Sequence, residues 1–254
     1  MSEPTLRQWL AEAPFSMGLS AGFFGFFAHS GVLEVLEEEQ LLPRRVAGAS
    51  AGALAGGLWA SGTTAQALGA ELYSLQRRDF WDPSPGLGLL RGRLFRQRLE
   101  QLLPVRCFEA CRIPLAVSVY DLMARRTRVI EAGLLAPAIQ ASCTLPGLFH
   151  PTWHEGRPLL DGGILDRPGL HGIPRGERVF YHHLASRSPW RRKQSPALEI
   201  PSRPAFRALV IRGLPRVGPF RLHHGRDALE AARAATRRAL DLPASHQVVE
   251  VTRT

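Results

Sequence analysis

Residues 46–57 read Val46-Ala47-Gly48-Ala49-Ser50-Ala51-Gly52-Ala53-Leu54-Ala55-Gly56-Gly57, a short apolar strand followed by a helix of small residues. Gly48, Ser50 and Gly52 fit the pattern G-x-S-x-G, in which a serine occupies a sharp turn between a strand and a helix. Glycine suits both flanks because a Cβ there would collide with the neighbouring strand or helix. The pattern predicts a nucleophilic serine at the end of a sheet, although small residues are also typical of a tightly packed buried helix.

A second glycine-containing turn, residues 21–27, precedes this run by one strand–helix unit and is crowded with phenylalanine. The carboxyl ends of adjacent parallel strands lie side by side, so this turn should face Ser50. The backbone N–H groups of Gly22 and Phe23, together with that of Ala51 at the start of the next helix, would then form an oxyanion hole. The alternative is a plain strand–helix connection with buried phenylalanines.

Residues 159–166 contain a candidate catalytic carboxylate. They read Leu-Leu-Asp-Gly-Gly-Ile-Leu-Asp. Asp161 stands at a predicted strand end, and Gly162 and Gly163 take little room beside it. Such a carboxylate can enter a crowded site, although Asp-Gly is also a common turn signal.

The length of 254 residues suits one α/β domain with a sizeable core. Apolar periodicity and turn signals predict the remaining elements. Strands are expected at 15–20, 44–47, 113–120, 127–131, 180–184, 205–212 and 247–252. Helices are expected at 1–14, 28–40, 49–59, 64–77, 91–103, 137–142 and 226–240, with a loop at 81–88.

The three cysteines are too few for a disulfide framework. Cys107 and Cys111 are predicted to lie on one face of a helix as buried thiols, and no second ligand pair follows, so neither a metal nor a cofactor is expected.

Charged residues interrupt residues 1–14, which argues against a signal peptide. The uncharged run 46–70 consists mainly of small residues, which favours a buried helix over a membrane span. A cytoplasmic protein is therefore expected.

The net charge of +10 is concentrated in residues 175–238, which contain 15 basic and 4 acidic residues. This region could contact phosphate groups at an anionic membrane surface as a peripheral protein, or it could be a solvated arginine-rich face. The basic helix at 91–103 has the same two interpretations, a membrane-facing lid or a surface helix. The basic, proline-containing stretch 186–204 is expected to be a loop. No aromatic interleaving accompanies the charge, so nucleic acid is not an expected partner.

Three ordered stretches together resemble the patatin-like phospholipase family. The first runs from Leu19-Ser20-Ala21-Gly22 through Gly31-Val32-Leu33. The second is Gly48-Ala49-Ser50-Ala51-Gly52-Ala53. The third is Ala141-Ser142-Cys143-Thr144-Leu145-Pro146-Gly147-Leu148-Phe149 leading to Asp161-Gly162-Gly163. Their order and spacing match that family over roughly residues 15–242.

The resemblance implies a single domain over residues 1–254 with a three-layer α/β/α sandwich around a central, mostly parallel sheet. It also implies metal-independent hydrolysis of acyl lipid esters, such as glycerophospholipids, by a serine–aspartate dyad. Carried over by position, Ser50 is the nucleophile and Asp161 its base. The family's loop G-G-G-x-[RK]-G is altered here, because only Gly22 stands in place and Gly25 occupies the usual basic position. Gly22 and Gly25 are expected to supply the unusual backbone dihedrals of this loop.

Two other functions remain compatible with these residues. A Ser–Asp–His esterase would use Ser50 and Asp161 with His182 or His183, an order that such triads permit. The simpler interpretation of these histidines is that they are strand or loop residues. A catalytically impaired protein on the same fold would instead bind lipid in a regulatory role without turning it over.

Overall fold

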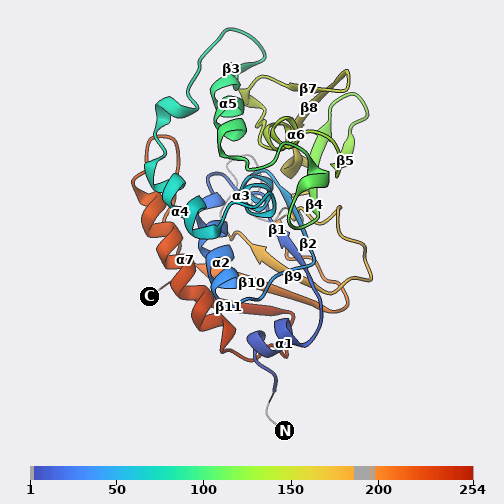
Figure 1. The fold of residues 1–254 in the computed structure, drawn as a ribbon, viewed down its shortest axis with the longest axis vertical. Helices are drawn as coiled ribbons and strands as arrows, with labels where there is room; N and C mark the ends of the chain where they lie inside the picture. The colour runs from blue at the N-terminus through green and yellow to red at the C-terminus, as the bar shows by residue number, and fades with distance from the viewer. Residues whose placement is uncertain (1–2, 186–194, 196–197, 254) are drawn as a thin grey trace.

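A central, mostly parallel sheet runs through the computed structural model, which describes residues 3–185, 195 and 198–253 (Figure 1). Within these residues the sheet has nine strands in the order β11-β10-β9-β1-β2-β4-β8-β7, and β5 pairs with β4. The strands from β11 to β4 are parallel, whereas β5, β8 and β7 are antiparallel to their partners. The bounds are β1 Ser16–Leu19, β2 Arg45–Ala49, β4 Leu115–Asp121, β5 Arg126–Ile130, β7 Thr152–His154, β8 Arg157–Asp161, β9 Val179–His183, β10 Phe206–Arg212 and β11 Val248–Thr252.

Helices pack against one face of this sheet and form the larger of two apolar clusters with it (Figure 1). The α-helices are α1 Leu6–Glu12, α2 Phe26–Glu38, α3 Ala51–Ala60, α4 Ala65–Ser74, α5 Arg93–Leu102, α6 Leu135–Ser142 and α7 His224–Leu240. Short 3-10 turns lie at η1 Arg77–Asp79, η2 Phe108–Ala110 and η3 Gly162–Ile164. The predicted α/β fold, with a central, mostly parallel sheet and flanking helices, is confirmed.

The opposite face of the sheet is covered differently. Leu170 and Ile173 pack there against Ala47, Ala116 and Tyr181 in a second, smaller cluster. Residues 165–178, which supply this cover, form successive turns rather than a helix. This face therefore has a thinner layer than the helical one.

The central helix α3 packs closely on the sheet because its glycines face the strands. A Cβ added at Gly52 would lie 2.1 Å from the backbone oxygen of Leu19, and one at Gly56 would lie 2.8 Å from the side chains of Leu19 and Val46. Any larger residue would push α3 outward. The small residues of the run 46–57 thus let β2 and α3 meet at a tight turn.

A cap of short elements projects beyond the sheet at the end of the molecule away from α1 (Figure 1). It contains η1, α5 and a two-stranded parallel sheet of β3 (Gly88–Leu90) and β6 (Gly147–Phe149), whereas α4 packs lower down against α2 and α7. Asp82 accepts the backbone N–H groups of Gly92, Arg93 and Leu94 and so fixes the start of α5. Residues 81–88 were expected to be a loop, but β3 begins at Gly88 because it pairs with a distant strand.

Cys107 and Cys111 do not share a helix face, since they flank the single 3-10 turn η2 and both are half-buried. Residues 186–194, 196 and 197 of the expected loop lie outside the described residues. In the described part of the chain, no helix combines the length and the apolar character needed to cross a membrane.

Candidate active site

Ser50 lies at the junction of β2 and α3 in a strained backbone conformation, with φ 53° and ψ −118°. Its N–H donates to Ser142 Oγ at 2.8 Å, and that hydroxyl donates to the backbone oxygen of Ser118 at 2.7 Å. The Cys143 thiol donates to the Ser50 carbonyl at 3.3 Å. A non-glycine residue keeps this conformation only when its surroundings hold it there. These contacts do so, and they link the elbow to α6 and β4.

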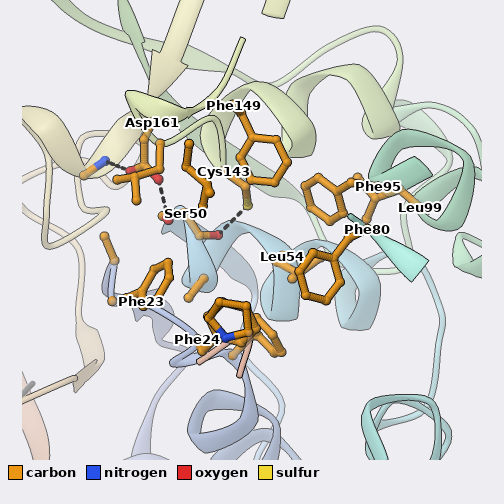
Figure 2. Close-up of a pocket in the computed structure, with 18 of the residues that line it drawn as sticks. Phe23, Phe24, Ser50, Leu54, Phe80, Phe95, Leu99, Cys143, Phe149 and Asp161 are labelled. Carbon is orange, nitrogen blue, oxygen red and sulfur yellow. Dashed lines mark hydrogen bonds between the residues drawn. The ribbon is translucent and has the colours of Figure 1, made fainter. Parts of the chain in front are cut away.

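Asp161 reaches Ser50 from the end of β8, which is 111 residues further along the chain. Ser50 Oγ lies 2.6 Å from Asp161 Oδ2, and the N–H of Gly163 donates to Asp161 Oδ1 at 2.8 Å (Figure 2). The N–H of Asp161 donates to the Thr144 carbonyl at 2.9 Å. The Asp161 side chain is therefore aimed at the serine, and only 5% of the residue is exposed.

The glycines beside these two residues are required by close backbone contacts. A Cβ at Gly162 would lie 1.9 Å from the backbone oxygen of Ser118, and one at Gly48 would lie 2.5 Å from the carbonyl carbon of Gly52. These distances are too short for any side chain. A Cβ at Gly163 would lie 2.6 Å from the Cβ of Ala21 and 3.0 Å from Asp161 Oδ1, so this position is also closed to a side chain.

The turn after β1 lies against the same site. Gly22, Phe23 and Ala51 line one cavity together with Ser50 and Asp161. The expectation that Gly22 and Gly25 supply the unusual dihedrals is wrong, because Phe24 has the positive φ of 54° and Gly25 has φ −73°. Phe24 adopts this backbone conformation, which favours glycine, because its ring packs against neighbouring aromatic rings.

A buried arginine that no sequence motif indicated also lines this cavity. Arg167 is 5% exposed, its carbonyl accepts the N–H of Ala21 at 2.7 Å, and its guanidinium donates to the Leu184 carbonyl at 2.8 Å. It thereby ties the start of the turn to the end of β9. Nothing in the sequence distinguishes it among 32 basic residues, since its burial depends on tertiary packing.

The cavity beside Ser50 has a volume of about 590 Å³ and is mainly apolar. Its wall extends from the serine between α3 and the cap, where the labelled side chains Leu54, Phe80, Phe95, Leu99 and Phe149 surround it (Figure 2). An apolar cavity of this size beside a polar pair suits a ligand with a long hydrocarbon part. The apolar side predicted for the helix at 91–103 therefore lines a cavity, which neither sequence interpretation anticipated.

Comparison with known proteins fits this arrangement. The model of the patatin-like phospholipase family matches residues 18–172, which include Ser50 and Asp161. The chain belongs to the patatin-like phospholipase family.

Relatives within this family share moderate identity. An uncharacterised NTE family protein of Mycobacterium tuberculosis is 32% identical over 155 residues, which are 59% of this chain and 43% of that protein. A lysophospholipase NTE1 of Mycosarcoma maydis is 30% identical over 59% of this chain and 8% of its own length. Neuropathy target esterase sws of Drosophila sechellia is 28% identical over 65% of this chain and 12% of its length. The match thus spans less than half of each of these relatives.

A solved structure, VipD from Legionella pneumophila, has a similar fold. It superposes with a TM-score of 0.55 at 17% identity, over 67% of this chain and 50% of that chain. At this identity the likeness concerns the fold alone.

The two candidate histidines lie in β9, on the far side of β1 from the strand that delivers Ser50. His182 Nδ1 lies 2.8 Å from His29 Nδ1, and His183 Nδ1 lies 3.2 Å from the Tyr181 hydroxyl. Neither is among the described residues that line the cavity. Burial lowers the pKa of His183 to about 4 and that of His182 well below its usual value. Both are therefore neutral strand residues at pH 7, as their simpler interpretation expected.

The thiol of Cys143 is a neutral group beside Ser50. Burial, with a smaller effect of the negative charge on Asp161, raises the Cys143 pKa well above its usual range. It therefore acts as an S–H donor and not as a thiolate. Among the residues that the structure describes, no cluster of histidine, cysteine or carboxylate side chains has the arrangement of a metal site.

Proposed function

We propose that this chain hydrolyses carboxylic esters of acyl lipids through a Ser50–Asp161 dyad. The observation that carries the proposal is the 2.6 Å contact between Ser50 Oγ and Asp161 Oδ2 beside an apolar cavity of about 590 Å³. A serine hydroxyl needs a base within hydrogen-bond reach to become a nucleophile, and the carboxylate is such a base. The cavity would hold the acyl chain.

In the first half-reaction, Ser50 Oγ attacks the ester carbonyl carbon while Asp161 Oδ2 accepts its proton. The carbonyl oxygen takes the negative charge and receives hydrogen bonds from backbone N–H groups of Gly22, Phe23 and Ala51. Collapse of this intermediate breaks the bond to the alcohol, which leaves with the proton from Asp161. An acyl-enzyme on Ser50 remains.

In the second half-reaction, water attacks the acyl carbonyl carbon and gives a proton to Asp161. Collapse releases the fatty acid, and Ser50 Oγ regains its proton from Asp161. Atoms and charges balance without a metal ion or an organic cofactor.

Two observations favour a dyad over a triad that includes His182 or His183. Ser50 reaches the carboxylate directly, and each histidine makes its hydrogen bond elsewhere in β9 and α2. The names of two relatives, a lysophospholipase and an esterase, support lipid esters as the substrate class. The family likewise supports acyl hydrolysis as the reaction.

Covalent labelling with a fluorophosphonate tests the proposal. We expect the wild-type protein to be labelled at Ser50, as mapped by mass spectrometry, and Ser50→Ala to remain unlabelled. Asp161→Asn should label and turn over esters at least about 10⁴-fold more slowly. Asp121→Asn is the matched control, because Asp121 is an equally buried carboxylate at a strand end that is paired with Arg157 away from the site.

His183→Ala separates the dyad from the triad. Turnover within a few fold of wild type would support the dyad, whereas a loss of about 10⁴-fold would establish a triad. Folded wild-type protein that binds lipid but is not labelled would refute hydrolysis and favour the regulatory lipid-binding role.

A further inference from the structure

Strand β3 carries leucines on both of its faces. Successive residues of an extended segment point to opposite sides, so Leu90 faces inward, whereas Leu89 and Leu87, which directly precedes the strand, face outward. Leu90 is fully buried and lines the cavity, whereas Leu87 is 80% exposed and Leu89 is 49% exposed. Outward positions of a strand that meets only water are normally polar. These two leucines therefore suggest an apolar partner on the outside.

The outward leucines stand directly on the cavity wall. β3 pairs with β6 in parallel, with Gly88 opposite Gly147 and Leu90 opposite Phe149. Phe149 and the exposed Pro146 line the cavity that contains Ser50. The outside of this small sheet and the inside of the cavity are thus two sides of one thin wall.

Exposed aromatic side chains border the cavity at a second place. Phe23 is 49% exposed and lines the cavity, as does the half-buried Trp81. Trp81 meets Phe220 edge-on at 5.8 Å between ring centroids, and Phe220 is 70% exposed. The guanidinium of Arg77 lies 5.1 Å from the Phe220 ring and 5.4 Å from the Trp81 ring. Of these rings only that of Trp81 is amphipathic, and tryptophan beside arginine is typical of a membrane–water interface, whereas the two phenylalanines add exposed apolar surface next to it.

The charge around these side chains is positive. Residues 75–99 contain six arginines and two aspartates. Both aspartates accept backbone N–H groups, Asp79 from Gln76 and Asp82 from the start of α5. Arg91 and Arg93 remain exposed beside the outward leucines. Apolar side chains ringed by arginine complement a surface of hydrocarbon and phosphate.

We propose that these residues form a docking surface for an anionic lipid bilayer. The surface, here called the rim surface, consists of Leu87, Leu89, Arg91 and Arg93 on the cap and Phe23, Arg77, Trp81 and Phe220 at the second border. Leu87 and Leu89 enter the headgroup region, and the arginines contact lipid phosphates. This inference rests on one part of the proposed function, namely that the cavity behind the surface receives acyl chains. Docking brings its opening to the lipid.

Vesicle sedimentation with the Ser50→Ala protein tests the surface without consuming the lipid. We expect binding to phosphatidylcholine vesicles that contain phosphatidylserine, weaker binding to phosphatidylcholine alone, and release as ionic strength rises. Leu87→Asp/Leu89→Asp should weaken partitioning about tenfold or more. Arg91→Gln/Arg93→Gln should weaken it about tenfold or more on the anionic vesicles only.

The matched control is Leu122→Asp/Met123→Asp. These residues are 41% and 67% exposed in the turn between β4 and β5, away from the cavity lining, so this variant should bind as the parent does. The proposal is overturned if the Leu87/Leu89 variant binds as well as the parent, or if the folded parent ignores anionic vesicles.

Turnover of a water-soluble ester, measured without vesicles and with Ser50 intact, separates the two proposals. The Leu87/Leu89 variant should keep this turnover within about twofold, because neither side chain lines the cavity. Wild-type protein that binds vesicles but does not hydrolyse the ester would refute the proposed function and leave the docking surface standing.

Discussion

A buried pair of histidines should make the fold sensitive to mild acid. His29 in α2 and His182 in β9 are fully buried, and their Nδ1 atoms lie 2.8 Å apart. His29 Nε2 lies 2.8 Å from the Ser20 carbonyl, so it carries the proton and leaves Nδ1 as the acceptor for His182. His182 Nε2 then carries no proton and has no hydrogen-bond partner among the described residues. Both rings are neutral in this arrangement. If His29 Nδ1 also carried a proton, two N–H donors would face each other across the 2.8 Å contact.

The magnitude follows from the difference in pKa between the folded and unfolded chains. Burial lowers the pKa of His29 from 6.5 to about 4. The unfolded chain therefore binds more protons between these values, so the stabilisation is complete above about pH 6.5 and is lost as the pH falls toward 4. At pH 5 the loss from His29 alone is about 2 kcal/mol relative to pH 7. His182 has a still lower pKa and acts in the same direction, although the two coupled rings do not add independently.

The contributions of other titratable groups to the pH dependence of stability can be separated from that of the His29–His182 pair. His183, which follows His182 in β9, also has a pKa of about 4, chiefly because it is buried and to a smaller extent because of the charge on Arg167. Asp121, whose pKa is lowered from 3.8 to about 2 by Arg157, loses its contribution only below the pH range of interest. His171 acts in the opposite direction, because its contact with Asp166 raises its pKa.

Urea unfolding followed by circular dichroism at pH 7 and pH 5 measures the effect. The wild-type protein should lose about 2 kcal/mol or more, and His29→Leu/His182→Leu should lose correspondingly less. His246→Leu, at an exposed histidine, should behave as wild type. Equal losses in the wild-type protein and the double variant would refute the reasoning. So would an NMR titration in which the His29 ring of the folded protein protonates near pH 6.5.

Three substitutions examine the site and its support. Ser142→Ala removes the contact to Ser118 and the acceptor for the N–H of Ser50, so the free energy of unfolding in urea should fall by about 2–4 kcal/mol and fluorophosphonate labelling should be slower. An unchanged unfolding free energy would contradict the role of this hydroxyl. Gly162→Ala would place a Cβ 1.9 Å from a backbone oxygen and should lower the free energy of unfolding by about 2 kcal/mol or more. Gly176→Ala is the control, because a Cβ there meets open space, and it should change the free energy of unfolding by under about 0.5 kcal/mol. Leu54→Trp fills the cavity beside Ser50 and should slow hydrolysis of a long-chain ester about tenfold or more, while hydrolysis of a butyryl ester changes little. Equal effects on both esters would show that the acyl chain binds elsewhere.

The sequence predicted the elbow and most of the elements around it because their signals are local. Gly48, Ser50 and Gly52 lie within five residues, and the structure shows why two of them must be glycine. Buried parallel strands give continuous apolar runs, which locate a strand without locating its partners. Asp161 has no comparable local signal, since it meets Ser50 across 111 residues. Its placement depended on resemblance to a family.

The cavity wall was not predictable in the same way. β3 and β6 have three residues each, too few for a periodic pattern, and they form because Gly88 and Gly147 pair across the cap. The basic helix α5 has a clear apolar side, but its sequence does not tell whether that side meets the core, a lipid or a cavity. Arg167 is a similar case, because its burial results from the turns at 165–178 closing over β1 and β9.

The altered turn after β1 shows how a sequence can depart from its family's pattern and still form the element. A positive φ costs a non-glycine residue on the order of 1–2 kcal/mol. The ring of Phe24 makes aromatic contacts with Phe23, Phe26 and Phe80 at centroid distances of 4.9, 5.4 and 6.0 Å. Each such contact is worth roughly 0.5–1.5 kcal/mol, so together they offset the backbone strain. Phe23 and Phe26, which replace glycines of the family's loop, therefore help to hold Phe24 in this conformation, and all three rings line the cavity. Because Ser142 already accepts the N–H of Ser50, the mechanism proposed above assigns the donors for a developing oxyanion to this turn and to the start of α3.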